Sequence, residues 1–301
     1  LVTPDIFLEV QRHPLYDDYW RERAAAERLG QIEVPVFSIG TWVKQDLHLA
    51  GNILGYQRAR GPKKLVITGT PTVFSSMTDF ASIEFHRKYL LPFYDRYMKG
   101  RQTSFEDRPN VEYPVRNTGR VRSFEGWPPP GTTAYSFHLS PGPTGSVNSL
   151  NDGALESAAP VSPGAKTSYS YPHPSWVVGV VPVGPHGPDP AAGVLTFTTK
   201  PLASDLEVAG SGKLILYGSS TRNDMDLIVK VSEQFSQPEE ERTKSIQPRY
   251  AIATKGWLRA SHMDRDPNRS TEQEPFYTHE KVTPLIPGKI YKIEIPLQPM
   301  A

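Results

Sequence analysis

Two short apolar runs limit what this chain can fold into. Residues 34–40 (VPVFSIG) and 63–69 (KKLVITG) are each bounded by glycine or proline, and each is followed by residues with helical spacing. A buried parallel strand needs helices on the faces of its sheet, so a strand followed by a helix, repeated, is typical of βα units. The sequence therefore predicts two parallel strands, with functional groups in the loops 41–47 and 70–77 that follow them.

Helical patterns flank these strands. Pro14 suits a first helical turn and predicts a helix that runs to about Leu29. A second, longer helix is expected over residues 78–99, where apolar residues recur at helical spacing and Gly100 provides a stop. Pro92 lies inside that pattern, so we expect it to kink the helix or divide it in two.

The pattern changes after Pro109. Residues 140–193 are rich in proline, glycine and serine and are expected to form a long loop. Short strand-like runs, separated by turn residues, lie at 111–115, 133–139, 194–199, 206–208, 213–217, 224–231, 250–258 and 290–295. Such spacing is typical of an antiparallel β-sandwich or jelly roll. The sequence thus predicts an α/β part followed by an all-β part.

Composition argues against several classes of protein. The 33 basic and 32 acidic residues are mixed along the chain, so no electrostatic footprint for nucleic acid or an anionic membrane is visible. No apolar run approaches the roughly 18 residues of a membrane span, and the first residues lack the order of a signal peptide. With no cysteine, disulfides are excluded, which is compatible with the cytoplasm and does not exclude secretion.

Several segments form a set that carries a family resemblance. They are HPLYDDYW (13–20), VPV leading into GTW (34–42), KKLVI (63–67), FYDRYMKG (93–100), GWP (126–128) and residues 201–226. In this order they resemble the cocaine esterase / X-prolyl dipeptidyl aminopeptidase family of serine hydrolases. The resemblance implies an α/β-hydrolase domain with a helical cap inserted in it, followed by a jelly roll of the galactose-binding-like kind.

The resemblance also implies an order of domains. Residues 1–106 are expected to form the C-terminal part of a hydrolase domain, opening with a remnant of the cap, and residues 107–301 an antiparallel jelly roll that the family continues further. In the family the serine nucleophile lies upstream, and this sequence has no G-x-S-x-G between a strand and a helix. Two strands with their helices cannot bury both faces of a hydrolase sheet, so we expect an exposed apolar edge or a homo-oligomer that covers it.

The same resemblance indicates the acid of a catalytic triad. The family has an acidic residue shortly after Gly-Trp and five residues before a glycine, which matches Asp46 and Gly51 with two extra residues after Trp42. A carboxylate there would hold the histidine base in the right tautomer. The alternative is that Asp46 caps the helix that follows it.

The histidine base is harder to find. The family's Gly-Pro-Trp-x-His pattern corresponds to residues 69–73, where Val73 occupies the histidine position. His48 and His86 are the nearest substitutes, and each could equally be an ordinary surface histidine. His262 and His279 lie in the β half without a constellation, and His173 and His186 lie in its long loop.

Two functions remain open from the sequence. The first is hydrolysis of small acyl esters or X-prolyl peptides, with the serine supplied by sequence not present here. The second is a catalytically silent relative whose jelly roll binds a ligand or partner. No cofactor is expected. Asp224 and Asp226 could bind a hard cation, but alternation on a solvent-facing strand explains them equally, so no metal site is predicted.

Overall fold

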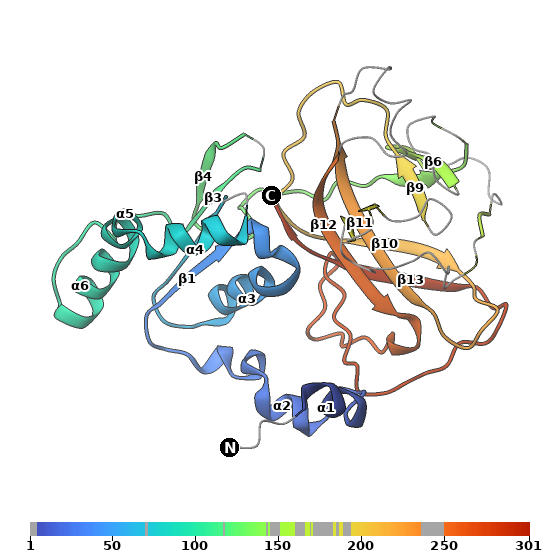
Figure 1. Ribbon diagram of the computed structural model, residues 1–301, viewed down its shortest axis with the longest axis horizontal. Coiled ribbons are helices and arrows are strands. Elements are labelled where there is room, and N and C mark those ends of the chain that lie inside the picture. Colours follow the sequence, from blue (N-terminus) through green and yellow to red (C-terminus); the bar gives the residue numbers. More distant parts are fainter. Residues whose placement is uncertain are drawn as a thin grey trace. The chain divides into compact units, whose positions relative to one another are not determined.

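The computed structural model describes eleven stretches of the chain: residues 5–69, 72–116, 118–142, 144, 151–159, 166–168, 170, 183–184, 187–188, 194–235 and 250–301. It divides into two compact units. Figure 1 labels its helices and strands and colours them along the sequence. The first unit comprises residues 1–132, 208–227 and 256–301, and the second comprises residues 133–207 and 228–255. His173 and His186 lie outside the described residues.

A mixed four-stranded sheet forms the centre of the first part of the chain. Its order is β1 (Val36–Thr41), β2 (Lys63–Thr68), β3 (Val111–Pro114) and β4 (Val121–Phe124). The first three strands run parallel and β4 is antiparallel to β3, which confirms the predicted parallel pair. Residues 111–114, expected among the sandwich strands, instead extend this sheet. The boundary placed after residue 106 stays a prediction.

The first predicted helix is shorter than expected. α1 (Ile6–Arg12) precedes α2 (Asp18–Arg23), and the 3-10 turns η1 (Ala25–Glu27) and η2 (Leu29–Gln31) follow. The chain is extended at Ala24, because long-range hydrogen bonds hold the segment beyond it: Arg58 Nη1 donates to Ala26 O (3.2 Å), and Arg60 N donates to Ile32 O (2.8 Å). Tertiary contacts here override the helix propensity of the alanines.

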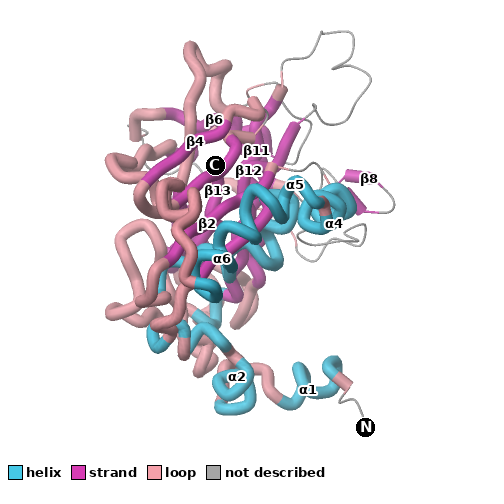
Figure 2. Tube along the Cα trace, turned by 90° about the vertical axis from the view of Figure 1, so that its left-hand side faces the viewer, coloured by secondary structure: helices cyan, strands magenta, loops and turns pink. Residues whose placement is uncertain are grey.

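The second predicted helix is divided. α4 (Val73–Ala81), α5 (Ile83–Phe85), the π-helical turn η5 (His86–Leu90) and α6 (Leu91–Lys99) follow one another (Figure 2). The main break is at Ser82, which is extended and accepts a hydrogen bond from Phe85 N (3.1 Å). Pro92 is the second residue of α6 and directly follows the π-helical turn η5, whose helical backbone continues through Leu90 and Leu91. Gly100, with φ of 66°, ends the helix in the predicted left-handed conformation.

An apolar core fixes the end of β1. The 3-10 turn η3 (Trp42–Lys44), the π-helical turn η4 (Gln45–Leu49) and α3 (Ala50–Arg58) follow β1. Trp42 packs edge-on against Tyr113 and donates its indole N–H to Pro114 O (3.0 Å). The buried members of this core are Trp42, Leu49, Ile53, Tyr56, Leu65, Ile67, Val111, Tyr113 and Trp127.

A second four-stranded sheet follows later in the chain, with the order β10 (Gly210–Gly218), β13 (Tyr291–Met300), β12 (Tyr250–Arg259) and β11 (Asp226–Gln234). β13 runs antiparallel to both β10 and β12. β12 approaches β13 closely at Gly256, where a Cβ would collide with the backbone oxygen of Pro296. The predicted strands at 213–217, 250–258 and 290–295 are therefore confirmed as members of one antiparallel sheet.

The remaining strands are short. β5 (His138–Ser140) runs antiparallel to β6 (Asn151–Glu156), which is parallel to β9 (Leu195–Thr198). β7 (Val183–Gly184) and β8 (Gly187–Pro188) form a two-stranded ladder. β6 falls inside the segment 140–193 that was expected to be a loop, and the prediction of a strand at 206–208 was wrong.

Candidate functional site

The carboxyl ends of β1 and β2 form the edge where the sequence places a site. Thr41 lies beside Thr68 in the parallel register, and its hydroxyl is 3.4 Å from Thr68 O. The same hydroxyl is 3.1 Å from the Ser76 Oγ of α4, and Ser76 is only 3% exposed. These hydroxyl contacts join α4 to both strand ends.

Position 46 lies in η4, one short turn beyond β1. Contacts of residues on both sides of position 46 hold this turn in place. Gln45 donates to Pro299 O (2.6 Å) and accepts from Arg116 Nη1 (3.2 Å), while Leu49 is fully buried. The helix-cap positions are Lys44 for η4 and Leu49 for α3, so the backbone does not place Asp46 at a cap.

The two candidate histidines lie at the surface. His48 is exposed and is two positions from 46 within one helical turn, a separation at which residues do not share a helix face. His86 is also exposed, and its Nε2 is 2.9 Å from Phe80 O. Among the described side chains, neither histidine contacts a carboxylate.

Position 73, where the family pattern has histidine, is the first residue of α4. Thr72 precedes it as the helix cap, accepting from Ser75 N at 3.1 Å while Ser75 Oγ accepts from Thr72 N at 3.0 Å. This reciprocal capping box fixes where the helix begins. Thr70 and Pro71 lie outside the described residues.

One acid–histidine pair escaped the sequence reasoning. His13 Nδ1 is 2.7 Å from Asp17 Oδ2, and the imidazole stacks on the Tyr19 ring at 4.2 Å. The hydrogen bond from His13 holds the pKa of Asp17 below its usual value. The other ring nitrogen faces Glu9 Oε2 at 3.9 Å, so both nitrogens are directed at carboxylates and neither is open to a nucleophile. The four-residue spacing in the sequence is the signal that could have found this pair.

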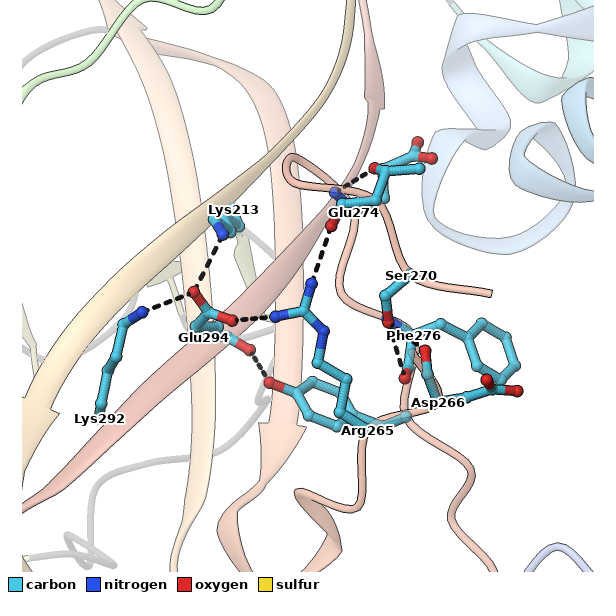
Figure 3. A network of polar contacts seen from close by, with 10 residues as sticks. Lys213, Arg265, Asp266, Ser270, Glu274, Phe276, Lys292 and Glu294 are labelled. Carbon is cyan, nitrogen blue, oxygen red and sulfur yellow. Dashed lines mark hydrogen bonds and ion pairs between the residues drawn. The ribbon is translucent and has the colours of Figure 1, made fainter. Parts of the chain in front are cut away.

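A network of polar contacts around Glu294 of β13 has a structural role (Figure 3). Its carboxylate, 12% exposed, lies 2.9 Å from Lys213 Nζ, 3.1 Å from Lys292 Nζ and 2.8 Å from Arg265 Nη1. Burial alone would raise the pKa of Glu294, but the lysine hydrogen bonds hold it below the usual value. Arg265 also donates to Thr271 O (2.9 Å), so the network fastens the loop after β12 to β13.

The acidic pair at 224 and 226 is already occupied by protein donors. Asp224 accepts from Ser261 N (2.9 Å) and Ser261 Oγ (2.8 Å), and Asp226 pairs with Arg259 at 2.8 Å. Within the described stretches, no group of three or more histidine, aspartate or glutamate side chains is arranged to hold a metal ion.

Comparison with protein-family models assigns both parts of the chain. Residues 3–71 match X-Pro dipeptidyl-peptidase (S15 family), and residues 103–301, more than half of the chain, match the X-Pro dipeptidyl-peptidase C-terminal non-catalytic domain. This chain belongs to the X-Pro dipeptidyl-peptidase family. The resemblance read from the sequence is confirmed.

Individual relatives agree with this family. A Mycobacterium bovis protein whose name carries the words serine esterase is 28% identical over 222 residues, which are 71% of this chain and 33% of that protein. Cocaine esterase of Rhodococcus is 24% identical over 257 residues, 78% of this chain and 44% of the esterase. A CocE/NonD family hydrolase of Staphylococcus aureus superposes with a TM-score of 0.65 at 21% identity, covering 99% of this chain and 49% of the hydrolase.

These matches locate the candidate residues within the family. Positions 46 and 48 fall in the segment that matches the S15 family, whereas His86 falls between the two matched segments. This chain spans half or less of the length of these relatives. Across the described residues, no helix is both long and apolar enough to cross a membrane.

Proposed function

We propose that this chain is the C-terminal portion of a serine hydrolase and that Asp46 is the acid of its catalytic triad. The observation that carries the proposal is the location of position 46, one turn beyond the carboxyl end of a parallel strand, inside the segment that matches the S15 family. Catalytic groups of α/β folds collect at this edge of the sheet. Gln45 and Leu49 hold the turn in place.

The proposed chemistry is acyl transfer. A serine from upstream sequence attacks the carbonyl carbon of the substrate, a histidine takes the serine proton, and the Asp46 carboxylate holds the imidazole in the required tautomer. The ester or amide bond of the substrate then breaks, and the alcohol or amine leaves with the proton that the histidine returns to it, which gives the acyl-enzyme. Water, deprotonated by the same histidine, attacks the acyl-enzyme and releases the acid and the free serine, with an oxyanion hole stabilising each tetrahedral intermediate. This reaction needs no cofactor.

The substrate class we propose is a small acyl ester or an X-prolyl peptide. Support comes from the names of the relatives, which include a cocaine esterase and an archaeal aminopeptidase that superposes with a TM-score of 0.64 at 19% identity. Residues 107–301 are proposed to form the family's jelly roll around the antiparallel sheet of β10, β13, β12 and β11.

Hydrolysis assays test the proposal. Purified chain and a version extended upstream in its own gene are compared on p-nitrophenyl acyl esters and on X-Pro p-nitroanilides. We expect turnover by the extended version only, abolished by a serine-directed phosphonate. A folded extended version that cleaves neither substrate would overturn the proposal.

A silent relative is the second candidate, and one observation favours it. Val73 occupies the histidine position, and neither His48 nor His86 contacts a carboxylate among the described side chains. If the histidine was lost, Val73→His in the extended version should create turnover that the parent lacks. Turnover by the parent itself would exclude this candidate.

A further inference from the structure

Two histidines meet away from the candidate site. His262 ends the 3-10 turn η7 (Ala260–His262) and is 8% exposed, whereas His279 lies at the surface. Their Nδ1 atoms are 3.3 Å apart. A neutral imidazole has one donor nitrogen and one acceptor nitrogen, so this contact requires one ring to donate and the other to accept.

The backbone at His279 is unusual. Its φ of 55° lies in the left-handed region, which residues other than glycine rarely adopt. Neighbouring contacts hold the turn: Thr278 N donates to Asp264 O (2.9 Å), and Asp264 pairs with Lys281 Nζ (2.9 Å). The surrounding loop thus determines a conformation that is unfavourable locally.

The turn at His279 contacts the N-terminal segment of the chain. Tyr16 N donates to His279 O (2.8 Å), and Arg21 Nη2 pairs with Glu280 Oε1 (2.7 Å). Residues 13–23, which include α2, therefore dock on residues 279–280. A change at the histidine pair acts directly on the carbonyl that receives Tyr16.

We propose that the His262–His279 contact is a pH-sensitive latch that keeps residues 13–23 docked at neutral pH and releases them on acidification. Protonating both rings would place two N–H donors and two like charges face to face, which breaks the contact. Although the residue as a whole is exposed, desolvation of its ring, and then the neighbouring His262, lower the pKa of His279 below its usual value. Docking should therefore be complete above the usual histidine pKa and weaken as pH falls below it.

Among the described residues, the charged groups next to the pair already have partners of their own. Asp264 pairs with Lys281, and Glu280 pairs with Arg21. Tyr277 presents its ring to His279 at 6.4 Å, and its hydroxyl donates to Glu294 O. In the docked segment, His13 Nδ1 lies 2.7 Å from Asp17 Oδ2. The surroundings therefore favour the neutral form of the His262–His279 contact.

Hydrogen exchange followed by mass spectrometry tests the latch on the chain as it exists. Protection of peptides covering residues 13–23 is measured at pH 7.5 and 5.5, corrected for intrinsic exchange rates, with β1 peptides as internal reference. We expect a several-fold faster exchange of residues 13–23 at pH 5.5. His279→Asn tolerates a positive φ and carries no titrating ring, so its protection should not change with pH.

Matched variants keep the proposal falsifiable. His86→Asn removes a surface histidine remote in sequence and should show the pH dependence of the parent chain. His262→Gln removes the other ring and should abolish that dependence, which covers the case in which His279→Asn does not fold. Equal protection of the parent at both pH values, or an unchanged pH dependence in both His279→Asn and His262→Gln, would overturn the latch.

Discussion

The helices after β2 and the loop after β12 differ in the kind of contacts and side chains found at their surfaces. α4–α6 present large apolar side chains to solvent: Phe74 is 80% exposed, Met77 65%, Ile83 71% and Met98 77%. In the loop after β12, residues 265–277 are instead held by polar contacts around Glu294, which engages Lys213, Lys292 and Arg265. Val282, Ile286 and Ile290, later in the same loop, are exposed. The helices therefore present a concentration of exposed apolar side chains, whereas residues 265–277 of the loop include no large exposed apolar side chain.

The apolar helices lie between the two segments that match family models. The apolar helices directly follow the strand whose end borders the candidate site, and β1 is an end strand of its sheet among the described strands. The end position of β1 and these exposed apolar side chains are compatible with the exposed apolar edge expected of a partial hydrolase domain, which stays a prediction. Whether a homo-oligomer covers them stays a prediction.

Removal of the central side chain of the first region should have the largest effect on stability. Trp42→Ala deletes a ring that is 4% exposed and packs against Tyr113 and Trp127, so we expect a loss of about 3–5 kcal/mol in the free energy of unfolding. Urea denaturation measures it. Trp257→Ala, at a 43% exposed site, is the matched control and should cost far less. Equal losses would contradict the importance of the Trp42 core.

The contribution of the Glu294 network to stability should depend on the charge of Glu294. Glu294→Gln leaves Lys213 and Arg265 without their carboxylate and should cost about 2–3 kcal/mol at pH 7. Because the folded pKa of Glu294 is lowered, its contribution is present above the usual glutamate value and is lost as pH falls through the folded value. The urea concentration at the midpoint of unfolding should therefore change less between pH 3 and pH 7 in the variant than in the parent chain.

A control variant gives a reference for the stability loss expected of Glu294→Gln. Glu280→Gln removes an exposed ion pair with Arg21, which should contribute about 1 kcal/mol or less. A Glu294→Gln loss no larger than the Glu280→Gln loss would show that the network does not hold the loop.

The exposed helices should give the smallest change in stability. Phe74→Ser combined with Met98→Ser alters two solvent-facing side chains, so the free energy of unfolding should change by only about 0.5 kcal/mol per site. Self-association, measured by sedimentation velocity, should decrease. Unchanged association would mean that these side chains do not form an interface between copies.

Local patterns predicted the elements whose partners are near in the sequence. β1 and β2 were visible because each is an apolar run with its own boundaries, and Gly100 ended α6 as expected. β3 was assigned to the wrong sheet, because VEYP at 111–114 alternates like any half-buried strand and only its pairing with β2 decides its place. Helix propensity likewise could not foresee the hydrogen bond from Arg58 that accompanies the turn beyond Ala24.

The candidate site shows the same limit. Position 46 could be predicted because family spacing and a strand end coincide there. The contact of His86 with Phe80 O, and the meeting of His262 with His279 across 17 positions, depend on turns that no local pattern encodes. Sequence alone therefore indicates a candidate for the acid, which stays a prediction, and assigns no base.

The most direct test of the account is the turnover of Asp46→Asn in the upstream-extended protein. With Asp46 as the triad acid, kcat on a p-nitrophenyl ester should fall by about 10³–10⁴-fold with little change in KM, because the imidazole loses its correct tautomer. Asp79→Asn, an exposed carboxylate on α4, should retain the parent kcat. Equal kcat values for Asp46→Asn and Asp79→Asn would contradict the proposal that Asp46 is the acid.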